Sequence, residues 1–222
     1  MPVTLAPPSH RERKKQATRD TIAVAALELT EERGIAGVTV DAIAARADVA
    51  PRTFFNYFSS KEDAVVGTDP HRSEDLATAL LERPAADAPL DALRHVLTED
   101  LMGRALSAEI LRRRICVIKA QPELRAAMAG QQDALGRRLS EAMAARAGRS
   151  LEDPYPALVT GAALAAVRVA LLHWCDDGGR TPLISWLDVT FAHLSAGLTG
   201  ETAGRPRRRP LSPAPSRRGG VK

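Results

Sequence analysis

Arg52, Thr53 and Asn56 lie close together in the segment APRTFFNYF, residues 50–58. Arginine and asparagine side chains can each form two hydrogen bonds with the edge of one base, guanine and adenine respectively. A threonine hydroxyl can contact a base or a phosphate. On a helix these three positions share one face, because residues three and four apart are neighbours. The segment therefore carries side chains suited to reading base edges, provided that a helix presents them.

The same segment holds half of the aromatic residues in a chain that is only 4% Phe, Trp and Tyr. Phe54 and Phe58 are four residues apart, so both rings share a face and can anchor the helix to its neighbours. A helix of about seven residues does not persist alone in water and depends on such packing. We therefore predict a short helix that packs against the neighbouring helices through the phenyl rings of Phe54 and Phe58.

A second short helix should precede this one. Thr39 is a suitable N-cap for a helix over residues 40–47, and Pro51 suits the first position of the next helix. Two short helices joined by a tight turn form a helix-turn-helix, whose second helix can lie in the DNA major groove. A long helix over residues 11–32 and a third short helix starting at Ser60, with acidic residues in its first turn, complete this unit.

Basic residues flank the unit and are expected to contact phosphates. They are Arg11, Arg13, Lys14, Lys15, Arg19 and Lys61. The net charge of the chain is +4, but residues 201–222 hold seven basic residues and one acidic residue, so the rest of the chain is slightly acidic. Attraction to nucleic acid should therefore be local.

The stretch from Thr18 to Val65, TRDTIAVAALELTEERGIAGVTVDAIAARADVAPRTFFNYFSSKEDAV, resembles the N-terminal DNA-binding domain of TetR-family transcriptional regulators. The resemblance implies a mostly helical homodimer that binds a palindromic operator in double-stranded DNA and releases it when a small molecule enters the C-terminal domain. It also implies a cytoplasmic, nucleoid-associated bacterial protein.

Carried over position by position, the resemblance implies phosphate contacts and base contacts in the helix-turn-helix. The phosphate positions are Thr39, Thr53, Tyr57 and Lys61, and the variable, base-reading positions are Arg52 and Asn56. Two residues depart from the family pattern. Phe55 stands at a phosphate-binding position where Tyr is commoner, so it lacks the hydroxyl. Ala50 replaces the Ser or Thr that often caps the recognition helix.

Beyond residue 67 the pattern predicts further helices near residues 73–82, 90–105, 108–120, 123–147, 155–176 and 182–198. No run of alternating β-branched residues is long enough for a sheet. We therefore predict an all-α fold with a helix-turn-helix DNA-binding domain at 10–67 and a helical ligand-binding and dimerisation domain at 68–200. Residues 1–9 and the basic tail at 201–222 should be disordered.

Residues 112–128, RRRICVIKAQPELRAAM, and the Ala-rich helix ending in HWC resemble an actinobacterial subgroup with acyl-CoA-like ligands. We expect ligand contacts at Arg113, Cys116, Arg168 and Trp174. The sequence leaves alternatives open: Arg168 could anchor an anionic ligand, pair with another helix or lie at a helix edge, and Trp174 could pack or stack on a ligand. Cys116 could equally be a small core residue.

The two cysteines are far apart in sequence and form no CxxC pair, so no disulfide is expected and a reducing cytosol is the simpler compartment. His173, Cys175, Asp176 and Asp177 lack a second ligand group at recognisable spacing, which argues against a metal site. Residues 157–175 have the length of a membrane span, but Arg168 near the middle favours a buried helix and no membrane partner.

The apolar helices at 155–176 and 182–198 need a partner surface, and a two-fold dimer supplies one as a four-helix bundle. The favoured interpretation is a ligand-responsive dimeric transcriptional repressor without catalysis or cofactor. One alternative is a sequence-nonspecific nucleoid-type DNA binder that relies on its basic tail. The other is a small helical carrier or enzyme, although no nucleophile–base pair, carboxylate dyad or phosphate loop supports it.

Overall fold

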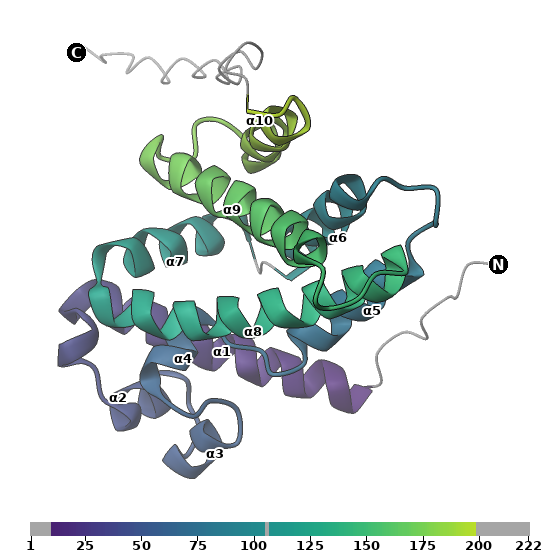
Figure 1. Cartoon of the computed structure of the whole chain (residues 1–222). Helices are drawn as coiled ribbons and strands as arrows, with labels where there is room; N and C mark the ends of the chain where they lie inside the picture. Colours follow the sequence, from purple (N-terminus) through teal and green to yellow (C-terminus); the bar gives the residue numbers. More distant parts are fainter. Residues whose placement is uncertain (1–9, 105–106, 199–222) are drawn as a thin grey trace, which may run out of the picture.

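The computed structural model describes residues 10–104 and 107–198, and every regular element in these two stretches is a helix (Figure 1). In order they are α1 (His10–Arg33), the 3₁₀ helix η1 (Ile35–Gly37), α2 (Val40–Arg46), α3 (Pro51–Phe55), α4 (Lys61–Val66), α5 (Arg72–Glu82), α6 (Pro89–Arg104), α7 (Ala108–Ala120), α8 (Pro122–Ala147), α9 (Pro154–Asp176) and α10 (Leu183–Ser195). The all-α prediction is confirmed. The segments 1–9 and 201–222, predicted to be disordered, lie outside the described residues.

The starts of the short helices follow their capping residues. The Thr39 hydroxyl accepts a hydrogen bond from the Ala42 N–H at 3.2 Å and caps α2. The Ser60 hydroxyl accepts one from the Asp63 N–H at 3.0 Å and caps α4. Helix α3 has no side-chain cap and begins at Pro51, as predicted. These local signals set the layout of the helix-turn-helix.

Helix α3 is shorter than predicted, because regular helix ends at Phe55. The chain continues in a turn, in which the Phe58 N–H still donates to the Phe54 carbonyl at 3.1 Å. Phe58 therefore keeps its helical position relative to Phe54, and both rings face the same side. The predicted anchoring survives although the helix is only five residues long.

Two hydrophobic cores organise the chain. One is built from α1 to α4 and is completed by Ile118 of α7 and Leu124 of α8. The other is built from α5 to α10, with Leu139, Leu187 and Phe191 fully or almost fully buried. Helix α8 runs across the middle of the molecule, with α1–α4 on one side and α7, α9 and α10 on the other (Figure 1). The helices of the second core thus also close the first.

Helix α9 is the one helix in the described residues that is long and apolar enough to cross a membrane by length and composition. It packs against α6, α7, α8 and α10, and residues such as Ala163 and Ala170 are fully buried in these contacts. Arg168 lies on its exposed side. The packing supports the interpretation of α9 as a core helix.

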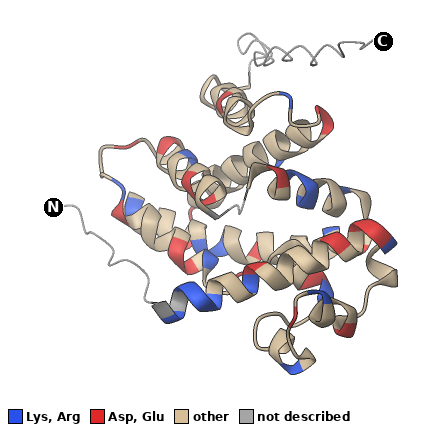
Figure 2. Cartoon of the chain, turned by 180° about the vertical axis from the view of Figure 1, so that it is seen from behind, with Lys and Arg blue, Asp and Glu red and all other residues tan. Residues whose placement is uncertain are grey.

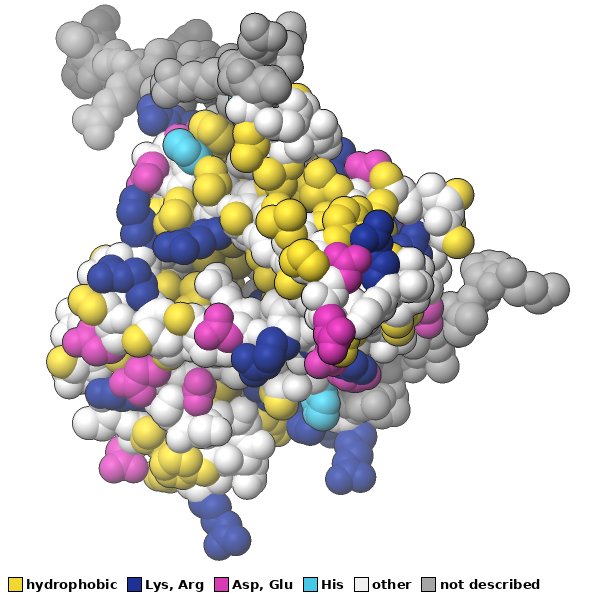
Figure 3. All heavy atoms as spheres, viewed as in Figure 1, with side chains coloured by type: hydrophobic (Ala, Val, Ile, Leu, Met, Phe, Trp, Pro, Cys, Tyr) yellow, Lys and Arg dark blue, Asp and Glu magenta, His cyan; other side chains and the backbone are white. Residues whose placement is uncertain are grey.

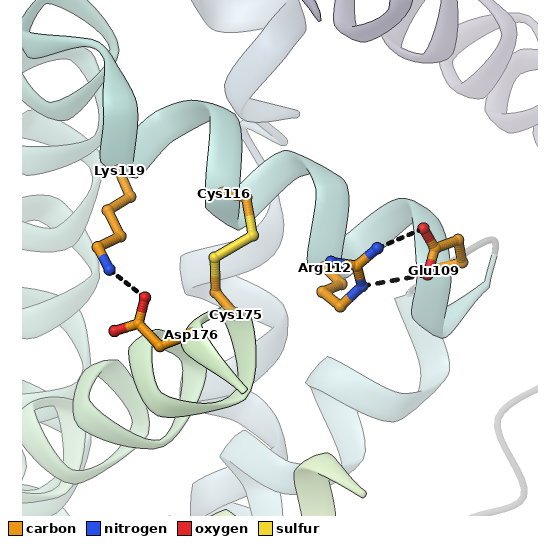
Figure 4. Close-up of a disulfide and its surroundings, with 6 residues drawn as sticks. All are labelled: Glu109, Arg112, Cys116, Lys119, Cys175 and Asp176. Atoms are coloured by element: carbon orange, nitrogen blue, oxygen red, sulfur yellow. Dashed lines mark hydrogen bonds and ion pairs between the residues drawn. A yellow bond between two sulfur atoms is a disulfide. The ribbon is translucent and has the colours of Figure 1, made fainter. Parts of the chain in front are cut away.

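The prediction that the cysteines are unpaired is wrong, because Cys116 and Cys175 form a disulfide between α7 and α9 (Figure 4). Their Cα atoms are 5.8 Å apart, although 59 residues separate them in sequence. The two helices pack side by side, so distance along the chain carried no information about distance in space.

Candidate DNA interface and effector cavity

Helix α3 divides its side chains between two faces as predicted. Phe54 and Phe58 are buried, with 0% and 3% of their surface exposed, and their ring centroids are 5.9 Å apart. Arg52 and Asn56 are exposed, and Thr53 is half-buried. The two residue types best suited to bidentate base contacts therefore point away from the core, where the edge of a DNA duplex can reach them.

Aromatic side chains border this polar face. Phe55 is 60% exposed and meets the edge of Phe54 at 5.4 Å between ring centroids. Tyr57 is half-buried and packs against the first core. A phenyl ring cannot donate a hydrogen bond to a phosphate, but it can make an apolar contact with a thymine methyl group. The Tyr57 hydroxyl can serve as a phosphate donor.

Lys61 has a structural role as well as its expected one. Its Nζ donates to the Ile35 carbonyl at 2.9 Å and to the Val38 carbonyl at 3.0 Å. An ammonium group has three donors, so one hydrogen remains for a phosphate. Thr39 is exposed, and its hydroxyl can donate while its oxygen caps α2. Both residues are compatible with phosphate binding.

The basic start of α1 separates into two parts. Arg11, Lys14 and Lys15 are exposed in its first turns, where Figure 2 shows Lys and Arg gathered. Arg19 is half-buried instead: its guanidinium carbon lies 4.7 Å from the centroid of the Phe58 ring, and it donates to the Thr68 carbonyl. The structure thus places Arg19 at the joint between α1 and the α4–α5 connection, apart from the other three.

A cavity of about 990 Å³ lies between the two cores. Its walls come from α1 and α4 on one side and from α5, α6, α7, α8 and α9 on the other. On the face seen in Figure 3 the surface is hollowed between α9 and α8. A change in the contents of this cavity would act on helices of both cores.

Arg114 is the most unusual polar group in the cavity wall. Its Nε is buried and has no hydrogen-bond partner. Burial lowers the pKa of Arg114 from its usual value, and the negative charge of Asp20 opposes that shift. Burial likewise raises the pKa of Asp20. A buried donor without an acceptor carries a desolvation penalty that an anionic ligand group would relieve.

Backbone geometry makes room for this arginine. Gly67 ends α4 with φ of 78°, and a Cβ at this position would lie 2.7 Å from Arg114 Nη1. A side chain here would therefore be strained by the positive φ and would collide with the guanidinium. The guanidinium of α7 therefore lies close to the end of α4.

The ligand contacts expected from the sequence are distributed around α7 and α9 rather than gathered in one place. Arg168 lines the cavity. Arg113 and Cys116 lie on another side of α7, in a shallow pocket of about 530 Å³. Trp174 is buried in the second core, outside the cavity wall. Sequence reasoning missed Arg114, although its spacing from Leu111 and Ile118 places it on the apolar face of α7.

Specific contacts tie α7 to the DNA-binding unit. Arg113 forms a two-fold ion pair with Glu31 of α1, with Nε to Oε1 at 3.0 Å. The Gln121 side-chain oxygen accepts a hydrogen bond from the Ile35 N–H at 2.7 Å. Helix α7 therefore touches the cavity with one face and the first core with another.

A short exposed reading helix, a flanking basic helix and a ligand-sized cavity shared by two cores define a ligand-responsive DNA-binding regulator. Residues 22–65 match the family described as bacterial regulatory proteins, tetR family, and residues 87–199 match the MftR C-terminal domain. The chain belongs to the TetR family of transcriptional regulators. Regulators of this family are cytoplasmic proteins, in agreement with the compartment expected above.

Two relatives match along most of the chain. The transcriptional regulator TcmR of Streptomyces glaucescens is 31% identical over 175 residues, which cover 75% of this chain and 77% of TcmR. The putative mycofactocin biosynthesis transcriptional regulator MftR of Mycobacterium tuberculosis is 28% identical over 186 residues, covering 84% and 93%. Both are named as regulators, which is consistent with a chain that is not an enzyme.

A solved structure shares the fold. FadR of Bacillus subtilis, described in complex with stearoyl-CoA, aligns with a TM-score of 0.53 and 18% sequence identity. The alignment covers 80% of this chain and 98% of that one. At this identity the likeness concerns the fold.

Proposed function

We propose that this regulator is a dimeric, nucleoid-associated repressor that leaves its operator when an anionic, hydrophobic effector of the acyl-CoA type enters the cavity. We place the boundary between its DNA-binding and effector-binding domains near residues 67–68. The observation that carries the proposal is the shared cavity, because Phe58 and Gly67 on the DNA-binding side face Arg114 and Ile115 on the other side. An effector bound there contacts both parts at once.

The cavity wall supports the chemical class of the effector. Leu97, Leu101, Leu135 and Leu164 offer an apolar lining for an acyl chain. Arg114 offers a half-buried cation for a negatively charged group, and its buried, unpartnered Nε supplies a donor. The volume lies at the upper end of the range of about 300–1,000 Å³ that is usual for small-molecule sites. A fatty acyl thioester with a phosphorylated head group fits these three properties.

The surface of α9 supports dimerisation. Leu158 and Val169 are 70% and 44% exposed, and Gly161 and Ala165 lie between them on the same side of the helix. Ala165 and Val169 also border the cavity, so the proposed dimer surface adjoins the effector site. Ile184 of α10 adds a further exposed apolar side chain, and Figure 3 shows hydrophobic side chains gathered over these two helices. Small residues between large apolar ones allow close helix approach, as in an isologous four-helix bundle.

Base reading by Arg52 and Asn56 is tested on the DNA upstream of the protein's own gene. Arg52→Ala should weaken binding by about 1–3 kcal/mol, or roughly 5- to 150-fold, and relax the preference at one base position. Asn56→Ala should relax a different position. Competition binding to a library with each operator position randomised measures both effects.

Arg33→Ala is the matched control, because it removes the same charge from the last turn of α1, outside the reading helix. It should leave the base preferences unchanged. If Arg52→Ala and Asn56→Ala keep the preferences of the wild type, the assignment of these two residues is incorrect.

Anion recognition by Arg114 is tested with stearoyl-CoA as the probe. Arg114→Gln should weaken binding by about 1.5–3 kcal/mol, or roughly 10- to 150-fold, because a charge-assisted hydrogen bond is lost. Isothermal titration calorimetry measures this loss. Arg112→Gln is the matched control: Arg112 is bonded to Glu109 and lies outside the cavity wall. Equal affinities for the two variants would contradict the role of Arg114.

A further inference from the structure

The Cys116–Cys175 disulfide joins α7 to α9, two helices that both line the cavity. Cys116 is in the middle of α7, and Cys175 is in the last turn of α9 (Figure 4). The opposite face of α7 lines the cavity with Leu111, Arg114 and Ile115. The bridge therefore joins the helix that touches the DNA-binding unit to the helix that carries the exposed apolar surface.

The two sulfur-bearing residues are not sealed in the core. Cys116 and Cys175 are both half-buried, in contrast to Ile115 and Trp174 beside them, which are buried. Cys116 also lines the shallow pocket of about 530 Å³, together with Arg112 and Arg113. Small oxidants and thiols can thus reach the bridge from solvent.

A second bond joins the same helices one turn along. The Lys119 ammonium pairs with the Asp176 carboxylate, and Figure 4 shows this pair beside the bridge. Both side chains are exposed, and an exposed ion pair contributes little on its own. Opening the disulfide would therefore loosen α7 relative to α9 without removing every contact between them.

We propose that Cys116 and Cys175 are a peroxide-sensitive modification site, at which a reversible disulfide restrains α7 against α9. A disulfide in a cytoplasmic protein is usually transient and redox-sensing rather than structural, which fits a bridge that solvent can reach. The proposal concerns the mobility of α7. Its consequence for DNA release rests on the proposed function, since α7 bonds to Glu31 and, through Gln121, to Ile35.

The chemistry needs only a hydroperoxide. The first thiol attacks the peroxide O–O bond, becomes a sulfenic acid and releases an alcohol, or water from hydrogen peroxide. The second thiol attacks the sulfenic sulfur, so that the S–S bond forms and the hydroxyl leaves as water with the thiol proton. The two cysteines lose two electrons in total, and the peroxide gains them. Glutathione or a small dithiol reverses the step by thiol–disulfide exchange.

The test compares the full chain after treatment with dithiothreitol or with hydrogen peroxide. Peptide mapping without reduction should show Cys116 linked to Cys175 only after peroxide, and dithiothreitol should reverse the link. Amide hydrogen exchange in residues 108–120 should be at least about tenfold slower in the oxidised form, because local opening of α7 is restrained. Cys175→Ser is the control, and its exchange in residues 108–120 should be the same after treatment with peroxide as after treatment with dithiothreitol.

The proposal is overturned if peroxide yields only sulfinic acids, or if the exchange of residues 108–120 is the same in both forms. Operator binding is measured on the same samples, first without and then with stearoyl-CoA. A slower exchange together with no operator binding in either form before stearoyl-CoA is added would support the redox site and contradict the proposed function. Operator release that is weaker in the oxidised form would support both.

Discussion

Replacing Phe54 with alanine is expected to destabilise the DNA-binding unit by about 3–5 kcal/mol, the usual loss for a fully buried phenyl ring. Phe54 is fully buried between α3 and the first core, and α3 has only five residues and no side-chain cap. A helix this short depends on its packing, so the reading face should lose its orientation. Urea unfolding followed by circular dichroism measures the stability, and a gel shift on the operator should show no retained complex.

The adjacent residue provides the control. Phe55→Ala removes the same ring from a position that is 60% exposed, so the free energy of unfolding should change by only about 0.5 kcal/mol or less. Both variants should remain dimeric, because the second core contains neither residue. A Phe54→Ala protein as stable as Phe55→Ala would show that the ring does not hold the recognition helix.

Placing a charge on the exposed face of α9 should have the second large effect. Leu158→Arg puts a guanidinium in the proposed dimer interface, and an unpaired buried charge costs about 3 kcal/mol or more. The dimer dissociation constant should therefore rise at least about 100-fold. Sedimentation velocity should show monomers. Operator affinity should fall as well, because two half-sites about 34–36 Å apart are then no longer bound by one particle.

Leu151→Arg is the matched control. Leu151 is 68% exposed, nearly the same as Leu158, but it lies in the turn before α9. The substitution adds the same charge to a leucine of equal accessibility and should leave the protein dimeric. Monomers in both variants, or dimers in both, would rule out the α9 face as the specific interface.

The sequence predicted those structural features that depend on residues close together along the chain. The caps at Thr39 and Ser60, the start of α3 at Pro51 and the two-faced pattern of Phe54 and Phe58 all depend on residues within one helical turn. The long family resemblance over residues 18–65 also rests on contiguous positions. For these features the structure agrees with the prediction because no distant contact competes with the local preference.

Features that depend on tertiary contacts could not be predicted from the sequence. The three consecutive residues Arg112, Arg113 and Arg114 look alike in sequence, yet they pair with Glu109, pair with Glu31 and enter the cavity respectively. Their different surroundings depend on how α7 is oriented about its own axis relative to the neighbouring helices, and the sequence does not show this orientation. The bond between Cys116 and Cys175 likewise depends on how α7 lies against α9.

The hydrogen bond that the Ile35 N–H donates to the Gln121 side chain links the junction between α7 and α8 to the basic surface. The Ile35 N–H donates to Gln121, and the Ile35 carbonyl accepts from Lys61. Ile35 thus bonds to Gln121 at the end of α7 through its N–H, and to Lys61 through its carbonyl. The Lys61 ammonium can in addition contact a phosphate. A shift of that junction would act on Lys61 through Ile35, whereas Arg52 lies on α3 and Asn56 directly follows α3. Operator release would then begin with the loss of the phosphate contact of Lys61, which lowers the affinity for every DNA sequence equally. The base preferences of Arg52 and Asn56 would be unchanged at that stage.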